Sequence, residues 1–248
     1  MKIFILMFLL LNTLLNASSI NVALAANVSY AITDLKEAFK KIHPDIDVKV
    51  TLSGSGTLTS QIIRGAPYDI FMSANMKYPE TLYKDGLSLN KPKIYAQGSL
   101  AILSVKKRDF SNLAKLLGDK SLKYIAIANP KTAPYGKATI EVLKNAKLYK
   151  ELKSKFVYAQ SISQTVTYTL TAADIGFIAK SSLYSKNMKE YKQAINWVEL
   201  DTKLYTPIKQ GIVLLKHAKN SKDAEVFYEF ILSEKAREIF KKFGYTLP

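Results

Sequence analysis

The sequence contains no cysteine, one tryptophan and only two histidines. Without cysteine there are no disulfide bonds and no thiolate metal ligands, but export is still possible, because disulfides are needed chiefly by small domains. Neither His43 nor His217 has a carboxylate or a second histidine at the spacing of a metal site. We therefore expect both histidines at the surface, no cofactor and no metal ion other than one that belongs to a ligand.

Long apolar runs are also scarce. After residue 19 no apolar stretch reaches the roughly 20 residues that a membrane-spanning helix needs. The start of the chain differs, with a basic residue at Lys2, an apolar run over residues 3–11 and small residues at 17–19, which is typical of a secretory signal. We predict that residues 1–19 are a signal peptide that is cleaved, and that the mature protein works in the periplasm.

Sequence motifs of catalysis are missing too. No phosphate-binding G-x-x-x-x-G-K-[ST] loop occurs, and the run Ser53-Gly54-Ser55-Gly56 lacks the glycine spacing of a nucleophile elbow. We therefore predict a protein that is not an enzyme and has no catalytic residues. The enzyme alternative needs a perturbed acid or base in a cleft, and a turnover assay with phosphate or sulfate esters would reveal it.

The net charge of +16 comes from lysines that are spread over almost every helical segment. A nucleic-acid-binding protein would gather them on one face or interleave them with stacking aromatic residues. We interpret them as a solvated surface that attracts small anions over a long range, and we expect no nucleic-acid partner. A gel-shift titration at physiological salt would detect the alternative.

Short apolar runs alternate with helical patterns along the chain, which is typical of α/β proteins. Two apolar strands, at 99–105 and 210–215, bracket a central block of about 100 residues. This arrangement predicts one lobe inserted into another, with residues 20–97 and 209–248 in lobe 1, residues 98–208 in lobe 2, and two hinge crossovers. We expect a mostly parallel sheet flanked by helices in each lobe. The predicted strands are 20–26, 46–52, 69–73, 99–105, 123–128, 155–157, 175–178, 197–199 and 208–215.

Two short segments predict the binding chemistry. Asn27 and Ser55 each follow an apolar strand pattern and precede a helical pattern. The main-chain N–H groups of a first helical turn and a neutral side-chain donor then point into the same space. Such an arrangement binds an anion, because the first N–H groups of a helix have no partner within the helix.

Asp69 and Asp174 each stand at the start of an apolar strand. We interpret them as strand-entry residues that accept hydrogen bonds from nearby main-chain N–H groups. The alternative makes them carboxylates that lock the hinge or the lobes. Neither is expected to touch an anion, which a carboxylate would repel.

Several blocks of the sequence resemble the periplasmic molybdate-binding proteins of ATP-driven molybdate importers, over nearly the whole mature chain and in the expected order. In lobe 1 these are Ala25-Ala26-Asn27, Gly54-Ser55-Gly56-Thr57-Leu58 with Gln61-Ile62, Gly65-Ala66-Pro67-Tyr68-Asp69, Phe71-Met72-Ser73-Ala74 and the segment 238–245. In lobe 2 they are Asn129-Pro130, Pro134-Tyr135-Gly136 and Ser161-Ile162-Ser163-Gln164-Thr165. The resemblance implies the two-lobed fold of type II periplasmic binding proteins, which agrees with the inserted lobe.

The resemblance also implies the ligand contacts. Asn27 and Ser55 would give side-chain and main-chain donors from lobe 1, and Tyr135 and Ile162 would give main-chain N–H groups from lobe 2. A second tier of residues would lie beside them: Ala26, Gly56, Pro134 and Ser163. Position 179 is alanine, where some family members place a tyrosine whose hydroxyl reaches the anion, so the similarity is to the branch that uses Tyr135.

The function that this resemblance implies is capture of molybdate, and of the nearly isosteric tungstate, by neutral donors and helix N-termini in a cleft between the lobes. The protein would act as a monomer and would deliver the anion to the membrane permease of an ABC importer. The alternative is a receptor for another tetrahedral oxyanion, either tungstate-selective or specific for sulfate.

Overall fold

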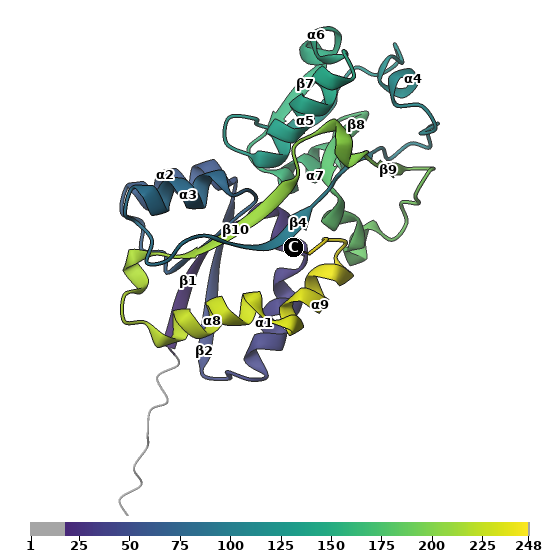
Figure 1. Cartoon of the computed structure of the whole chain (residues 1–248). Coiled ribbons are helices and arrows are strands. Elements are labelled where there is room, and N and C mark those ends of the chain that lie inside the picture. Colours follow the sequence, from purple (N-terminus) through teal and green to yellow (C-terminus); the bar gives the residue numbers. More distant parts are fainter. Residues whose placement is uncertain (1–17, 248) are drawn as a thin grey trace, which may run out of the picture.

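The computed structural model describes residues 18–247, which form two five-stranded sheets flanked by helices (Figure 1). The predicted signal peptide lies almost entirely outside these residues. We call each sheet with its helices a lobe. The first sheet has the order β2-β1-β3-β10-β4, with strands β1 (Ser18–Ala25), β2 (Ile46–Ser53), β3 (Ile70–Ser73), β4 (Lys93–Gly98) and β10 (Ile208–Leu214). The second has the order β7-β6-β8-β5-β9, with strands β5 (Leu100–Leu103), β6 (Ile125–Ala128), β7 (Phe156–Ala159), β8 (Ile175–Ala179) and β9 (Trp197–Glu199).

Helices cover both faces of each sheet. The α-helices are α1 (Ile32–Lys40), α2 (Ser55–Ile63), α3 (Lys77–Lys84), α4 (Leu113–Leu117), α5 (Pro134–Asn145), α6 (Tyr149–Leu152), α7 (Ile162–Thr171), α8 (Lys222–Leu232) and α9 (Glu234–Lys242). Short 3₁₀ helices are η1 (Ala26–Tyr30), η2 (Lys153–Lys155), η3 (Lys180–Tyr184), η4 (Lys186–Met188), η5 (Thr202–Leu204) and η6 (Lys216–Ala218). No helix within residues 18–247 has the length and apolar character to cross a membrane.

The two-lobed α/β fold is confirmed, and each of the nine predicted strands has a counterpart. Both sheets are more mixed than we expected, because in each of them two strand pairs are parallel and two are antiparallel. Strand β4 was not predicted, since Lys93, Gln97 and Gly98 interrupt its short apolar pattern. β4 is an edge strand that pairs with β10 alone in the sheet, so its other side is not covered by a strand and polar residues are tolerated there.

The chain crosses between the lobes where β4 of the first sheet ends at Gly98 and β5 of the second begins at Leu100. It returns after β9, and β10 then inserts between β3 and β4. In Figure 1, β4 and β10 run side by side on the path between the lobes. The lobe boundaries that we predicted, between residues 97 and 98 and between residues 208 and 209, stay a prediction. The two crossovers lie beside them.

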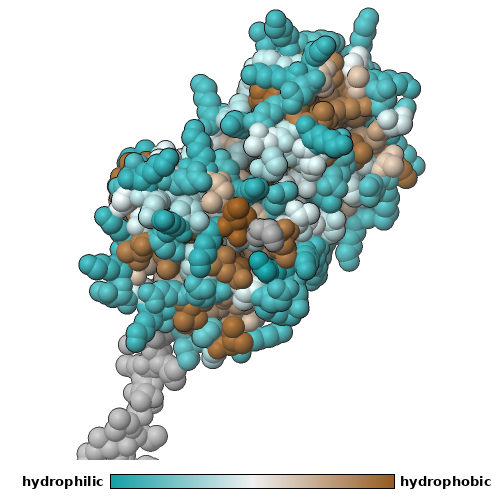
Figure 2. All heavy atoms as spheres, viewed as in Figure 1, coloured by the Kyte–Doolittle hydropathy of each residue, from teal (hydrophilic) through white to brown (hydrophobic). Residues whose placement is uncertain are grey.

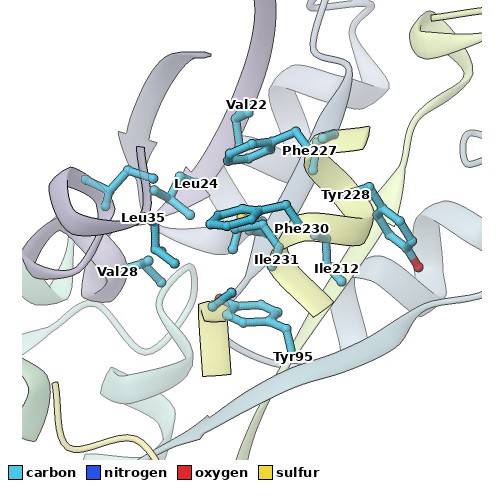
Figure 3. Packing of buried hydrophobic residues seen from close by; sticks show 14 of the residues in the cluster. Val22, Leu24, Val28, Leu35, Tyr95, Ile212, Phe227, Tyr228, Phe230 and Ile231 are labelled. Atoms are coloured by element: carbon cyan, nitrogen blue, oxygen red, sulfur yellow. The ribbon is translucent and has the colours of Figure 1, made fainter. Parts of the chain in front are cut away.

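The core of the first lobe follows from the alternation of side chains along β1. Val22 and Leu24 face the helices α1, α8 and α9, whereas Ala23 faces α2 and α3. Figure 3 shows Phe227 and Phe230 of α8 against this face of the sheet. The ring of Phe39 lies edge-on to that of Phe227, with centroids 4.9 Å apart, so the beginning and the end of the described chain share one core.

Asp69 and Asp174 are strand-entry residues, as we predicted. One carboxylate oxygen of Asp69 accepts the N–H of Asn21 at 2.7 Å, and Asp174 accepts the N–H groups of Lys123 and Tyr124 at 2.7 and 2.9 Å. These bonds lower the pKa of Asp174, against the opposing effect of burial. His217 is half-exposed, and its Nδ1 lies 2.7 Å from Asp69. The histidine therefore has a carboxylate partner that the sequence did not indicate.

The surface matches the composition. Figure 2 shows hydrophilic side chains over most of this face of both lobes, with scattered apolar patches between them. Lysines such as Lys40 and Lys41 at the end of α1 are exposed. Within residues 18–247 no group of three His, Asp or Glu side chains could hold a metal ion.

Candidate anion-binding site

The four predicted ligand residues follow four equivalent strands. β1 and β2 are parallel neighbours in the first sheet, and β6 and β7 are parallel neighbours in the second. The carboxyl ends of such strands meet at one edge of a sheet, where open α/β sheets bind ligands. Asn27 follows β1, Ser55 follows β2, Tyr135 follows β6 and Ile162 follows β7.

All four residues line one small cavity between the lobes. Its empty space, counted together with space that is open to solvent, is about 190 Å³. The second-tier residues Ala26 and Pro134 line it too, but Gly56 and Ser163 do not. The complete lining is Ala25, Ala26, Asn27, Ser53, Gly54, Ser55, Ala74, Ala133, Pro134, Tyr135 and Ile162.

No charged side chain is among these lining residues. Lys137 lies in a neighbouring groove with its Nζ 3.8 Å from Glu141, and Arg64 lies at the far end of α2 from Ser55. The positive potential of the cavity comes instead from first helical turns, whose N–H groups carry a partial positive charge. The cavity is therefore suited to an anion without a counter-ion from the protein.

Ser55 is the first residue of α2 and is 1% exposed. Its Oγ accepts the main-chain N–H of Ala74 at 2.9 Å, which fixes the position of the oxygen. The hydroxyl hydrogen has no acceptor among residues 18–247. Ser55 therefore has one O–H donor available to a ligand.

Asn27 is fully buried, and its side-chain donors are already used within the protein. Its Nδ2 donates to Oε1 of Gln210 at 2.8 Å and to the hydroxyl of Tyr245 at 2.9 Å. Its carbonyl oxygen accepts from Tyr245 and from Ser181, while its Oδ1 has no partner among the described residues. This arrangement favours the main-chain N–H of Asn27, rather than its side chain, as the donor to an anion.

Tyr135 is the second residue of α5, after a proline that fits the first position of a helix. Its hydroxyl lies beside the lobe crossover, where Nε2 of Gln210 is 3.4 Å away. A Cβ at Gly98 would fall on this hydroxyl, so only glycine fits there. Burial, with added repulsion from Tyr245 and Tyr95, raises the pKa of Tyr135 well above its usual value, so the hydroxyl stays protonated.

Ile162 begins α7, and its helix start is capped. Ser161 is the N-cap and its Oγ accepts the N–H of Gln164, while Oε1 of Gln164 accepts the N–H of Gln160 at 2.7 Å. These two bonds form a capping arrangement of serine and glutamine three residues apart. They leave the N–H groups of Ile162 and Ser163 without a capping acceptor.

The second-tier residue Gly56 has a different role from the one we expected. Its N–H donates to the carbonyl oxygen of Thr132 in the second lobe, at 2.8 Å. A Cβ at position 56 would come within 2.6 Å of the Tyr78 hydroxyl and 3.0 Å of the Thr132 Cα. Gly56 therefore brings the lobes into contact. Ser163 instead pairs its hydroxyl with that of Ser161, at 3.1 Å.

The sequence did not point to the side chains that support the site. Gln210 and Tyr245 hold Asn27, and Tyr95 in turn bonds Gln210 at 2.8 Å. Two signals were present. Gln210 is a polar residue in a mostly apolar strand, and Tyr245 belongs to a block that resembles the molybdate-binding proteins.

Comparisons with known proteins agree with the two-lobed fold. The model of the family described as bacterial extracellular solute-binding proteins matches residues 20–246. The molybdate-binding protein ModA of Azotobacter vinelandii is 34% identical, over 93% of this chain and 91% of its own. ModA of Rhodobacter capsulatus is 32% identical, over 93% and 89%. The solved structure of the Azotobacter vinelandii periplasmic molybdate-binding protein has a TM-score of 0.85 at 33% identity, covering 92% of this chain and 99% of that one.

Proposed function

Because the chain belongs to the bacterial extracellular solute-binding proteins, we propose that it captures molybdate in the cavity between its lobes. Members of this family bind solutes for transport, so the chain is a binding protein rather than an enzyme. The observation that carries the proposal is the convergence of Asn27, Ser55, Tyr135 and Ile162 on one cavity without charged side chains. Two relatives over 30% identical are named for molybdate.

The donor set suits a tetrahedral dianion. Each of its four oxygens can accept about two hydrogen bonds, and hydrogen bonds to a charged acceptor are stronger than neutral ones. The Ser55 hydroxyl has a free hydrogen, and the main-chain N–H groups of Asn27, Tyr135 and Ile162 would supply further donors. Each helix N-terminus adds about 0.3–1 kcal/mol at an exposed site, and more when it is partly buried.

Selectivity would come from size. Tungstate is nearly isosteric with molybdate, so we propose that both bind. Sulfate carries the same charge on shorter bonds, and its oxygens would reach fewer of the fixed donors. The second candidate is a receptor for another tetrahedral oxyanion, either selective for tungstate or specific for sulfate, because the same neutral donors could serve either anion.

The protein would meet its ligand outside the cytoplasmic membrane as a monomer, with no cofactor, and pass it to the permease of an ABC importer. Ser18 and Ser19 belong to β1, where they pair with Ile46 and Asp47. Signal cleavage directly before Ser18 would leave this strand whole. A mass measurement of the exported protein tests this, and an intact Met1 would contradict export by cleavage.

Calorimetric titration of the mature protein with molybdate, tungstate, sulfate and phosphate tests the proposed function. We expect molybdate and tungstate to bind and to raise the melting temperature. Ligand binding to the folded state stabilises it by RT ln(1 + [L]/Kd), about 4 kcal/mol at a thousandfold excess over Kd. Equal thermal shifts from sulfate and molybdate would show that the assigned anion is wrong.

A further inference from the structure

Gln210 is a polar residue buried where the lobes meet. It lies on β10 and is 0% exposed. The register between β10 and β4 shifts between Gln210 and Gly211, which marks a β-bulge. Bulges next to binding sites re-aim a side chain. Here the bulge lies at the residue whose side-chain amide contacts Asn27 and Tyr135.

The amide of Gln210 joins residues from both lobes. Its Oε1 accepts from Asn27 Nδ2 at 2.8 Å and from the Tyr95 hydroxyl at 2.8 Å. Its Nε2 lies 3.4 Å from the Tyr135 hydroxyl. Asn27 and Tyr135 line the cavity from opposite lobes, whereas Gln210 does not line it. Gln210 therefore connects the two walls of the site without reaching the ligand space.

The surroundings leave this amide little freedom. A Cβ on Gly98 would lie 2.8 Å from Nε2 of Gln210 and would overlap the Tyr135 hydroxyl. Gly98 is also the residue at which the chain leaves the first sheet. A change in the angle between the lobes would thus move Gly98, Tyr135 and Gln210 relative to one another.

We propose that Gln210 is a positioning residue for anion binding, a role that rests on the proposed function. It holds the Asn27 side chain and so fixes the first turn of η1 with its main-chain N–H groups toward the cavity. Through Tyr135 it links this turn to the second lobe. A neutral amide suits the role because it accepts two bonds and donates one without placing a negative charge near the anion.

Molybdate titrations of variants separate this role from a structural one. Gln210→Met keeps the volume and removes all three bonds, and we expect it to raise Kd about tenfold or more. Gln97→Met is the matched control, because it makes the same change on the neighbouring strand β4, at a residue that does not line the cavity. We expect the control to leave Kd within about twofold of the wild type.

A double-mutant cycle tests whether Gln210 acts through Asn27. In an Asn27→Ala background, Gln210→Met should change Kd by less than about threefold, because the residue that it positions has lost its side chain. If the effects of Gln210→Met and Asn27→Ala on the free energy of binding were fully additive, the proposal would be overturned. Tyr245→Phe removes the other partner of Asn27 Nδ2, so it also should raise Kd, which tests the same role if Gln210→Met does not fold.

A measurement without ligand keeps this inference separate from the choice of anion. Hydrogen exchange over residues 24–31 should become about tenfold faster in Gln210→Met than in the wild type, but not in Gln97→Met. A wild type that binds molybdate, with unchanged Kd and exchange in Gln210→Met, would overturn the role of Gln210 and leave the proposed function standing. If the wild type does not bind molybdate but hydrogen exchange is faster in Gln210→Met, the proposed function would be overturned and the role of Gln210 would stand.

Discussion

Gly56 in the first lobe donates its main-chain N–H to the carbonyl oxygen of Thr132 in the second, at 2.8 Å. This bond lies directly beside the cavity, because Gly54 and Ser55 line it. The absence of a side chain at position 56 is what permits the lobes to approach this closely. Approach of the lobes and enclosure of the anion are therefore coupled at one residue.

Gly56→Ala should weaken molybdate binding about tenfold or more. The added methyl group would meet the Tyr78 hydroxyl and the Thr132 backbone, and overpacking of this kind costs about 1–3 kcal/mol. Calorimetry gives Kd, and the melting temperature of the ligand-free protein should change little if the open form relieves the contact. Ile63→Ala, at an exposed position of the same helix, is the control. An unchanged Kd in Gly56→Ala would rule out the coupling.

Ser55→Ala should raise Kd by a factor that corresponds to about 1.5–3 kcal/mol, the usual effect of removing a hydrogen bond to a charged group. The variant loses the free O–H donor and the acceptor of the Ala74 N–H. Ser60→Ala removes an exposed serine hydroxyl from the same helix and should bind as the wild type does. Similar affinities for the two variants would exclude Ser55 from the ligand contacts.

Tyr135→Phe should raise Kd by less than about threefold. Its hydroxyl lies against Gly98 and Gln210, and its main-chain N–H is retained in the variant. Titration with molybdate and with tungstate is the measurement. A hundredfold loss would mean that the hydroxyl touches the anion, and would reverse the role given to this residue.

Neutralising nearby cations should leave the affinity largely intact, since no charged side chain lines the cavity. Arg64→Gln and Lys137→Gln should keep Kd within a few-fold at low salt and at roughly 0.5 M salt, where the Debye length is only a few Å. The reversal of Lys40 and Lys41 to glutamate should slow association more than it changes Kd, because these charges act through solvent. A hundredfold loss in either neutral variant would show direct pairing with the anion.

The stability of the protein should fall as the pH rises from 10 to 12. Burial raises the pKa of Tyr245 to about 12, so the folded protein keeps a proton there that the unfolded chain releases near pH 10. This difference in pKa adds about 1.4 kcal/mol to the free energy of unfolding for each pKa unit. The added stability is complete below pH 10 and is lost by pH 12. Denaturant titrations at several pH values measure it. Tyr245→Phe should flatten this dependence, whereas Tyr83→Phe, at an exposed position, should not.

The sequence alone could predict nine of the ten strands within residues 18–247. Asn27 and Ser55 could be predicted from local features, because each follows an apolar strand pattern and precedes a helical pattern. Tyr135 and Ile162 came instead from the resemblance to molybdate-binding proteins. The inserted lobe followed from two apolar strands far apart in the sequence. Local patterns could not show that β5 and β10 run opposite to their neighbours, since strand direction depends on where the chain crosses between lobes.

The supporting contacts could not be predicted in the same way. Gln210 meets Asn27, and Thr132 meets Gly56, only because the sheets bring distant segments together. We predicted that the Asn27 side chain would donate to the ligand, but its Nδ2 donates to Gln210 and Tyr245 instead. Periodicity identifies which face of an element is buried, but not which polar groups will meet there.

Strand β10 lies between β3 and β4 in the first sheet. β3 and β4 therefore cannot pair with it until the chain that forms the second lobe has been synthesised. The strands of the second sheet, from β5 to β9, are contiguous in the sequence and can pair first. Contacts between distant segments slow folding. The first lobe should therefore complete its fold only after the second lobe has been synthesised.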